Sequence, residues 1–149
     1  MNKANNHRVI MVHDFNESAR RGMQEEHSRY LISLDMFIAS IKQSLKAGIP
    51  FDSISSFDST TEDKVEITSD DGGGSSILLA QRLNNLDIRA TFFIVTSLIG
   101  TEGFLNEGEI RYIRSLGHNI GSHSHTHPSP FCDLTLESIE FEVLKAERS

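Results

Sequence analysis

Hydrophobic and polar residues follow two different periods along this chain, and the change of period predicts alternating strands and helices. Segments of strand length occupy residues 8–13, 65–69, 90–95 and 119–122, and the run at 90–95 is continuously apolar, aromatic or β-branched. Apolar residues at helical spacing predict helices over residues 33–47, 76–86, 107–116 and from 135 onward. Strands that alternate with helices imply a largely parallel sheet and an α/β fold, with any site at the carboxyl ends of the strands.

Polar residues at the predicted helix ends suit those positions. Ser33 and Thr135 are suitable N-caps, as is Ser75 or Ser76, and Gly48 can end the first helix. The last predicted helix is amphipathic, with its apolar residues at Leu136, Ile139, Val143 and Leu144. The polar segments Asn16–Ser28 and Phe51–Asp63 are expected to be connections between elements.

The second predicted strand ends abruptly in two adjacent carboxylates, Asp70 and Asp71, which three glycines follow. Neighbouring carboxylates repel each other unless a positive charge or a shared proton compensates. The glycines lack side-chain bulk and let a ligand or another segment approach closely. An ordinary Asp-Gly turn between a strand and a helix explains the same residues. This segment alone therefore leaves the choice between a turn and a site open.

Composition and charge limit the classes of protein that need to be considered. The chain has 149 residues, of which 38% are hydrophobic and 23% charged, as in one ordinary globular domain. Its formal net charge of −7 argues against a general nucleic-acid-binding protein. No apolar run is long enough for a transmembrane helix, and residues 1–7 lack a signal-peptide core, so we expect a cytoplasmic protein. The single cysteine, Cys132, is expected to be a structural thiol.

Three of the seven histidines, His123, His125 and His127, lie within five residues directly after the fourth predicted strand. Neutral imidazole is a common metal ligand. In an extended segment all three rings would point to one face, whereas in a helical turn His123 and His127 would share a face and His125 would point away. A catalytic zinc site needs three protein ligands and one open position, which two of these histidines and a carboxylate would supply. Since Asp70 and Asp71 are expected on the same edge of the sheet, we favour a metal site over a polar loop.

Three motifs occur in order along the chain: Thr68–Ser69–Asp70–Asp71–Gly72, the strand Ala90–Thr91–Phe92–Phe93, and His123–Ser124–His125–Thr126–His127–Pro128. Together they resemble the polysaccharide deacetylase (NodB-like) family of carbohydrate esterases. The resemblance implies a distorted (β/α) barrel, here incomplete at the C-terminus. It extends upstream, where a strand that ends near a histidine and the helix from Ser33 to Gly48 resemble an N-terminal extension. We therefore expect one domain over 1–149, with the extension at 1–62 and the N-terminal half of the core at 63–149.

Residue by residue, the resemblance implies a metal-dependent hydrolase that removes N-acetyl groups from an amino-sugar polymer or oligosaccharide. Asp70 matches the family's catalytic base, and Asp71, His123 and His127 match its metal ligands. Zn²⁺ is the expected ion, with Co²⁺ as an alternative, and an N-acetylated carbohydrate is the expected substrate. An ion of this kind lowers the pKa of a bound water and polarises the amide carbonyl.

The chain also departs from the family's pattern. Ser69 stands where the family usually has Phe, and Gly73 where it often has Pro or Tyr, so the resemblance leaves substrate fit beside the base open. His125 is not a ligand position in the family, although it could compete for metal. The family's later motifs, including a histidine that acts as general acid, have no counterpart before Ser149. The alternative function is therefore a truncated or degenerate domain that binds metal or carbohydrate without turnover.

Overall fold

A computed structural model of the chain describes residues 8–16, 31–51 and 64–148. They form a four-stranded parallel sheet with the strands in the order β1, β2, β3, β4. The strands are β1 (Arg8–Val12), β2 (Val65–Ser69), β3 (Thr91–Ile94) and β4 (Asn119–Ser122). All four predicted strands are confirmed to within a residue or two. Most of the two predicted polar connections, 16–28 and 51–63, lies outside the described residues.

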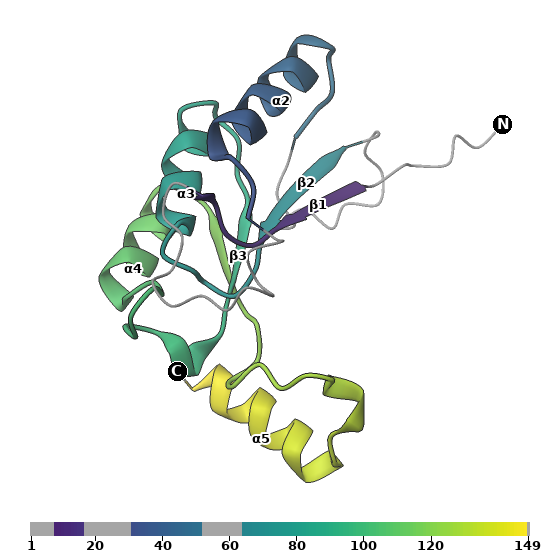
Figure 1. The fold of residues 1–149 in the computed structure, drawn as a ribbon, viewed down its shortest axis with the longest axis vertical. Helices are drawn as coiled ribbons and strands as arrows, with labels where there is room; N and C mark the ends of the chain where they lie inside the picture. The colour runs from purple at the N-terminus through teal and green to yellow at the C-terminus, as the bar shows by residue number, and fades with distance from the viewer. Residues whose placement is uncertain (1–7, 17–30, 52–63, 149) are drawn as a thin grey trace, which may run out of the picture.

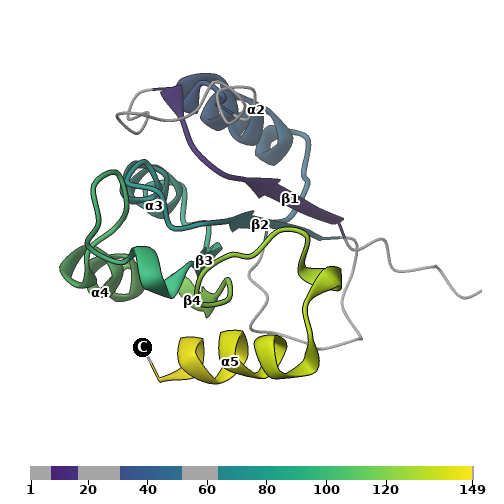
Figure 2. The same ribbon diagram turned by 60° about the horizontal axis from the view of Figure 1, so that its bottom comes forward.

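Helices α2 (Leu34–Lys46), α3 (Ser76–Asn84) and α4 (Glu107–Ser115) each lie between two neighbouring strands in the sequence. They cover one face of the sheet (Figures 1 and 2). Strands in sequential order with their helices on one side form part of a barrel, since a doubly wound sheet reverses its strand order. The described residues therefore form a β/α layer of barrel type.

Local sequence sets the helix ends. The Ser33 side chain accepts a hydrogen bond from the backbone N–H of Met36 at the start of α2. At the start of α4, Asn106 and Glu109 form a reciprocal capping box. The prediction for α3 needs a correction, because Ser75 occupies the N-cap position but makes no capping bond. Its hydroxyl instead donates to Asp14 Oδ1 at 2.8 Å.

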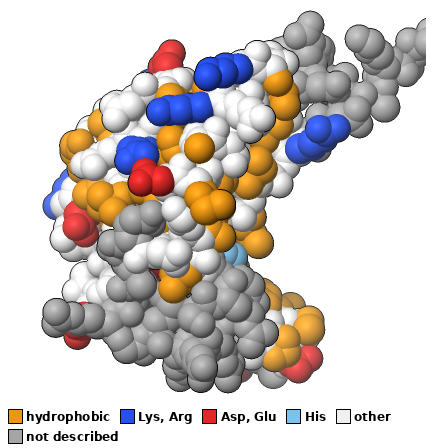
Figure 3. All heavy atoms as spheres, turned by 45° about the horizontal axis from the view of Figure 1, so that its top comes forward, with side chains coloured by type: hydrophobic (Ala, Val, Ile, Leu, Met, Phe, Trp, Pro, Cys, Tyr) orange, Lys and Arg blue, Asp and Glu red, His pale blue; other side chains and the backbone are white. Residues whose placement is uncertain are grey.

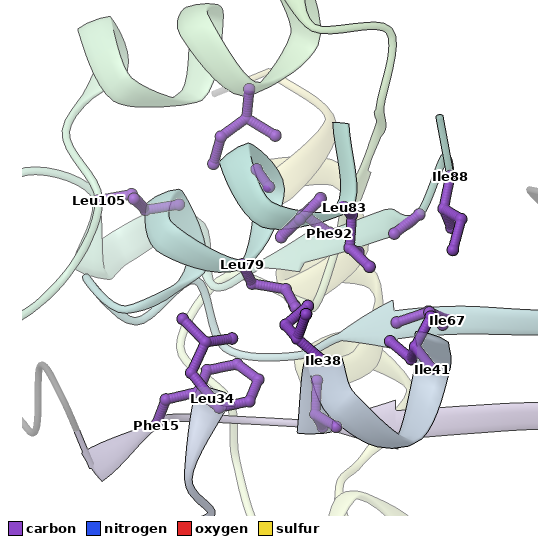
Figure 4. Close-up of a cluster of buried hydrophobic side chains, with 14 of the residues drawn as sticks. Phe15, Leu34, Ile38, Ile41, Ile67, Leu79, Leu83, Ile88, Phe92 and Leu105 are labelled. Atoms are coloured by element: carbon purple, nitrogen blue, oxygen red, sulfur yellow. The ribbon is translucent and has the colours of Figure 1, made fainter. Parts of the chain in front are cut away.

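The register of the strands separates a helix-covered face from an open face. Val12, Ser69 and Phe92 are in register and lie on the helix side. The core lies there, and Figure 4 shows Ile67 and Phe92 of the sheet among side chains of α2 and α3. Residues one step along, such as Met11 and Thr68, alternate to the open face. Asp70 and His123, each one residue beyond its strand, return to that open face at its carboxyl edge.

At β1, apolar side chains on the open face are exposed to solvent. Val9 and Met11 of β1 are 53% and 59% exposed. Figure 3 shows another view of the surface, in which hydrophobic side chains appear in several places between Lys and Arg side chains. Within the described residues, no helix is both long enough and apolar enough to cross a membrane.

Helix α5 (Leu136–Glu147) lies apart from the layer of the other three helices (Figures 1 and 2). Its predicted apolar stripe is largely exposed, with Leu136 at 85%, Val143 at 54% and Leu144 at 40%. The buried side chains of this helix are Glu142 and Ala146. The helix itself was predicted correctly. Its apolar stripe is not the face that it buries, because the buried positions are those of Glu142 and Ala146.

One buried histidine holds the helix layer to the sheet. His118 is 3% exposed, and its Nδ1 accepts a hydrogen bond from the Ala90 backbone N–H at 3.2 Å. The neutral ring therefore carries its proton on Nε2, which donates to the Ala80 carbonyl at 3.0 Å. Burial lowers the pKa of His118, the Ala80 carbonyl partly opposes this effect, and the nearby Arg89 adds to it.

We expect the free energy of unfolding to fall as the pH drops below about 6.5, the ordinary pKa of histidine. Because its pKa is lowered, His118 binds a proton less readily in the folded chain than in the unfolded chain, so acid favours unfolding. The decrease attributable to His118 is at most about 1.4 kcal/mol per pH unit. Urea unfolding at pH 7.5 and 5.5 would measure it, with His118→Gln as the control that lacks this titration. An equal pH dependence in both proteins would contradict the prediction.

Candidate metal centre

Backbone geometry at the end of β2 places the two carboxylates on the carboxyl edge of the sheet. The Asp70 N–H donates to the Val12 carbonyl at 2.9 Å, which extends the pairing of β2 with β1. Asp71 then adopts a left-handed backbone with φ of 71°. Gly72 follows with φ of 77°, and a Cβ there would lie 3.0 Å from the Ile94 side chain. This position therefore requires glycine, and the turn holds Asp71 over the end of β3.

The histidine segment is a loop rather than a strand or a helical turn. It begins where the His123 N–H donates to the Ile94 carbonyl at 2.8 Å. Ser124 and His127 both have left-handed backbones, with φ of 64° and 56°. The Ser124 hydroxyl accepts a hydrogen bond from the His127 N–H at 3.1 Å. The loop thus brings the rings of His123 and His127 together, with centroids 4.9 Å apart.

Asp71, His123 and His127 point one donor atom each toward a common centre. Nε2 of both histidines lies 3.7 Å from Asp71 Oδ1. The donor atoms of all three residues lie within 4.8 Å of one another. In a tetrahedral zinc site with bonds of about 2.0–2.1 Å, neighbouring donor atoms are about 3.4 Å apart. The donors are too far apart for hydrogen bonds to each other, and their types and spacing fit a divalent ion.

Asp70 lies beside this group but in a more buried position. It is 7% exposed, and its Oδ2 is 3.9 Å from His123 Nε2. Its Oδ1 is buried and has no hydrogen-bond partner among the described residues. Burial raises the pKa of the Asp70 carboxyl, and the Asp71 carboxylate adds to the rise, whereas His123, His13 and His127 oppose it. Such a carboxylate has a free oxygen with which to accept a proton.

His13 belongs to this edge of the sheet, and sequence reasoning did not assign it to the site. It directly follows β1, next to the residue whose carbonyl binds the Asp70 N–H. A charge on His13 lowers the pKa of Asp70, so the two side chains are within electrostatic range. The one signal in the sequence that could have assigned His13 to the site is its position directly after an apolar strand. The long separation in sequence between His13 and Asp70 concealed that both lie at this edge of the sheet.

His125 does not join the donor group. Its Nδ1 lies 2.8 Å from the Thr96 hydroxyl, and its ring packs edge-on against Phe141 of α5. Glu142 of the same helix accepts hydrogen bonds from the backbone N–H groups of His125 and Thr126. Burial opposes the ionised form of Glu142, but its bonds from Thr126 and His125 prevail, so its pKa is lowered. Sequence reasoning missed Glu142, which resembles any other charged helix residue.

Ser69 and Gly73, the two residues that depart from the family's motif, both make contacts within the fold. The Ser69 side chain faces the helix layer, is 1% exposed, and has its hydroxyl 3.3 Å from the Ser76 hydroxyl. Gly73 forms an isolated antiparallel bridge with Phe104. Ser69 therefore points away from the edge where the carboxylates lie.

A cleft of about 760 Å³ opens beside the histidines. It is lined by residues of the histidine loop, by Phe131, and by Val143 and Glu147 of α5. The donor group is therefore next to a space large enough for a small molecule or part of a polymer.

Residues 57–149 match a family model described as polysaccharide deacetylase. This match covers more than half of the chain. The chain belongs to the polysaccharide deacetylase family. A curated relative, the peptidoglycan-N-acetylglucosamine deacetylase PgdA of Listeria monocytogenes, is 30% identical over 91 residues. Those residues are 60% of this chain and 18% of PgdA, so the chain spans about a fifth of that relative's length.

Solved structures of polysaccharide deacetylases share the fold. A polysaccharide deacetylase from Bacillus cereus matches 95% of this chain with a TM-score of 0.79 at 20% identity, and 45% of that protein is covered. The Streptococcus pyogenes deacetylase PplD, solved with acetate, matches 95% of this chain with a TM-score of 0.76 at 18% identity, and 66% of PplD is covered. The predicted α/β fold, a distorted (β/α) barrel that is incomplete in this chain, is confirmed. The division of the deacetylase domain at residues 62 and 63 stays a prediction.

Proposed function

We propose that this chain is a metal-dependent hydrolase that removes N-acetyl groups from an amino-sugar polymer or oligosaccharide. One observation carries the proposal, namely the convergence of Asp71, His123 and His127 on one centre with the buried Asp70 beside it. Membership of the polysaccharide deacetylase family supports the reaction class. The name of PgdA supports an N-acetylated amino sugar as the substrate class.

Asp71, His123 and His127 would hold the divalent ion, with Zn²⁺ as the expected ion and Co²⁺ as an alternative. Such an ion lowers the pKa of water and polarises the carbonyl of an amide. Asp70 has an oxygen without a hydrogen-bond partner among the described residues, and in the proposed reaction it accepts the proton of the attacking water. Cleavage of the amide bond then yields acetate and an amine.

The departing amine needs a proton, and we propose that His13 supplies it. It lies on the same edge of the sheet as Asp70 and influences its pKa. We expect His13→Gln, which keeps a polar side chain but cannot carry the proton, to lower kcat for acetate release by about 10²-fold. Zinc affinity should stay within a few-fold of the unchanged chain. A variant with full kcat would exclude His13 from proton transfer.

The proposed function is tested by adding Zn²⁺ or Co²⁺ to the purified chain and assaying acetate release from an N-acetylated chito-oligosaccharide. We expect one bound ion per chain, a higher melting temperature with zinc, and acetate release that a chelator abolishes. The proposal fails if no ion binds. Metal binding without acetate release would instead favour the alternative function, a domain that binds metal or carbohydrate without turnover.

A further inference from the structure

Glu142 of α5 makes three hydrogen bonds to the loop between the two proposed histidine ligands. Its Oε2 accepts from the backbone N–H groups of His125 and Thr126 at 2.8 and 2.7 Å. Its Oε1 accepts from the Thr126 hydroxyl at 2.6 Å. Both carboxylate oxygens therefore accept hydrogen bonds, and all the donors belong to the two residues just before His127.

This contact is unusual for an exposed helix, since Glu142 is only 4% exposed. Burying a carboxylate is costly unless hydrogen bonds compensate, and here three bonds from the loop do so. The apolar side chains of α5, among them Leu136 and Val143, remain exposed. The helix is thus joined to the loop by a buried carboxylate, beside the edge-on contact between Phe141 and the His125 ring.

The loop needs support from outside, because its backbone is strained at both ends. Ser124 and His127 adopt left-handed backbones, which non-glycine residues rarely adopt. Such conformations persist where the surroundings fix them. Glu142 binds the two N–H groups between these residues, so it holds the backbone that directly precedes His127.

We propose that Glu142 is a positioning residue that holds the His123–His127 loop in the metal-binding geometry. This inference rests on the proposed function, because it assigns Glu142 to the support of the same metal site. Glu142 is not itself a metal ligand and touches neither His123 nor His127 through the bonds described above. The competing explanation is that Glu142 merely anchors α5, in which case its loss would lower stability but leave metal affinity unchanged.

The test is zinc affinity, measured by competition with a metal buffer well below the melting temperature of each protein. Glu142→Gln keeps the size of the side chain but turns an amide N–H₂ toward the loop donors. We expect its Kd for zinc to rise 10–100-fold, the range typical for the loss of a group that orients a metal ligand. The visible spectrum of the Co²⁺-loaded variant should also change, which reports coordination geometry independently of stability.

Glu140→Gln is the matched control, because it removes an exposed carboxylate from the same helix. We expect its Kd to stay within about twofold. If Glu142→Gln does not fold, Thr126→Val still removes the bond to Oε1 and keeps both backbone bonds, and its Kd should rise by a smaller factor of three to ten.

The inference would be overturned, and the proposed function left intact, if Glu142→Gln bound zinc as tightly as the unchanged chain. If Glu142→Gln does not fold, an unchanged Kd for zinc in Thr126→Val would overturn it in the same way. So would an equal loss in Glu140→Gln. If the unchanged chain binds no zinc, the proposed function fails and this inference fails with it, a pattern that the other outcomes do not produce.

Discussion

His123→Ala is expected to abolish both zinc binding and acetate release. Nε2 of His123 lies 3.7 Å from Asp71 Oδ1, and its ring is 4.9 Å from that of His127, so its loss removes one of three donors. Loss of a direct ligand should weaken zinc binding by more than about 100-fold, the upper range for groups that only orient a ligand. Zinc content after dialysis against a metal buffer and the initial rate of acetate release measure the two effects.

His125→Asn is the control for His123→Ala, because it removes an imidazole from the same loop but not from the donor group. We expect it to keep its zinc with less than about a tenfold loss of affinity. Equal loss in the two variants would mean that loop disruption, rather than ligand removal, explains the effect. Retained zinc in His123→Ala would contradict the proposed ligand set.

Asp70→Asn is expected to separate metal binding from turnover. The substitution preserves the size of the side chain but removes its ability to accept a proton from water. A general base contributes about 10²–10⁴-fold to rate, so acetate release should fall by that factor. Zinc affinity should change little, since Asp70 does not belong to the group of converging donors.

The measurement pairs kcat for acetate release with the Kd for zinc, and both values decide the role of Asp70. Unchanged kcat would exclude Asp70 as the base. A large loss of zinc affinity would show instead that Asp70 is a ligand, which its Oδ2, at 3.9 Å from His123 Nε2, makes worth testing.

The elements of the fold were accessible from the sequence because their signals are local. The run at Thr91–Ile94 is aromatic or β-branched throughout, as a strand buried on both sides requires, and Val65, Ile67 and Thr68 give β2 the same character. The capping residues Ser33 and Thr135 set helix boundaries within a few positions. The family motifs then supplied the barrel, which periodicity alone does not distinguish from an open sheet.

What the sequence did not provide are interactions between distant segments. The Ser75 hydroxyl looked like a helix cap, but it binds Asp14, 61 residues away in the sequence. His13 approaches Asp70 only through the pairing of β1 with β2. Glu142 faces the histidine loop, while apolar residues of its helix face solvent. In each case a tertiary contact overrode the simplest local interpretation.

The left-handed backbones of Asp71 and His127 limit which residues evolution can place there. Asp, Asn and His tolerate this conformation better than most residues, whereas long or β-branched side chains adopt it poorly. Glutamate at position 71 would offer the same carboxylate, but its backbone would be more strained in this conformation. Its longer side chain would also carry the carboxylate beyond the position that the Asp71 carboxylate occupies. A residue at either position must therefore meet two requirements: it must offer a metal-binding donor atom, and it must tolerate a left-handed backbone. Only a few small or planar polar side chains meet both.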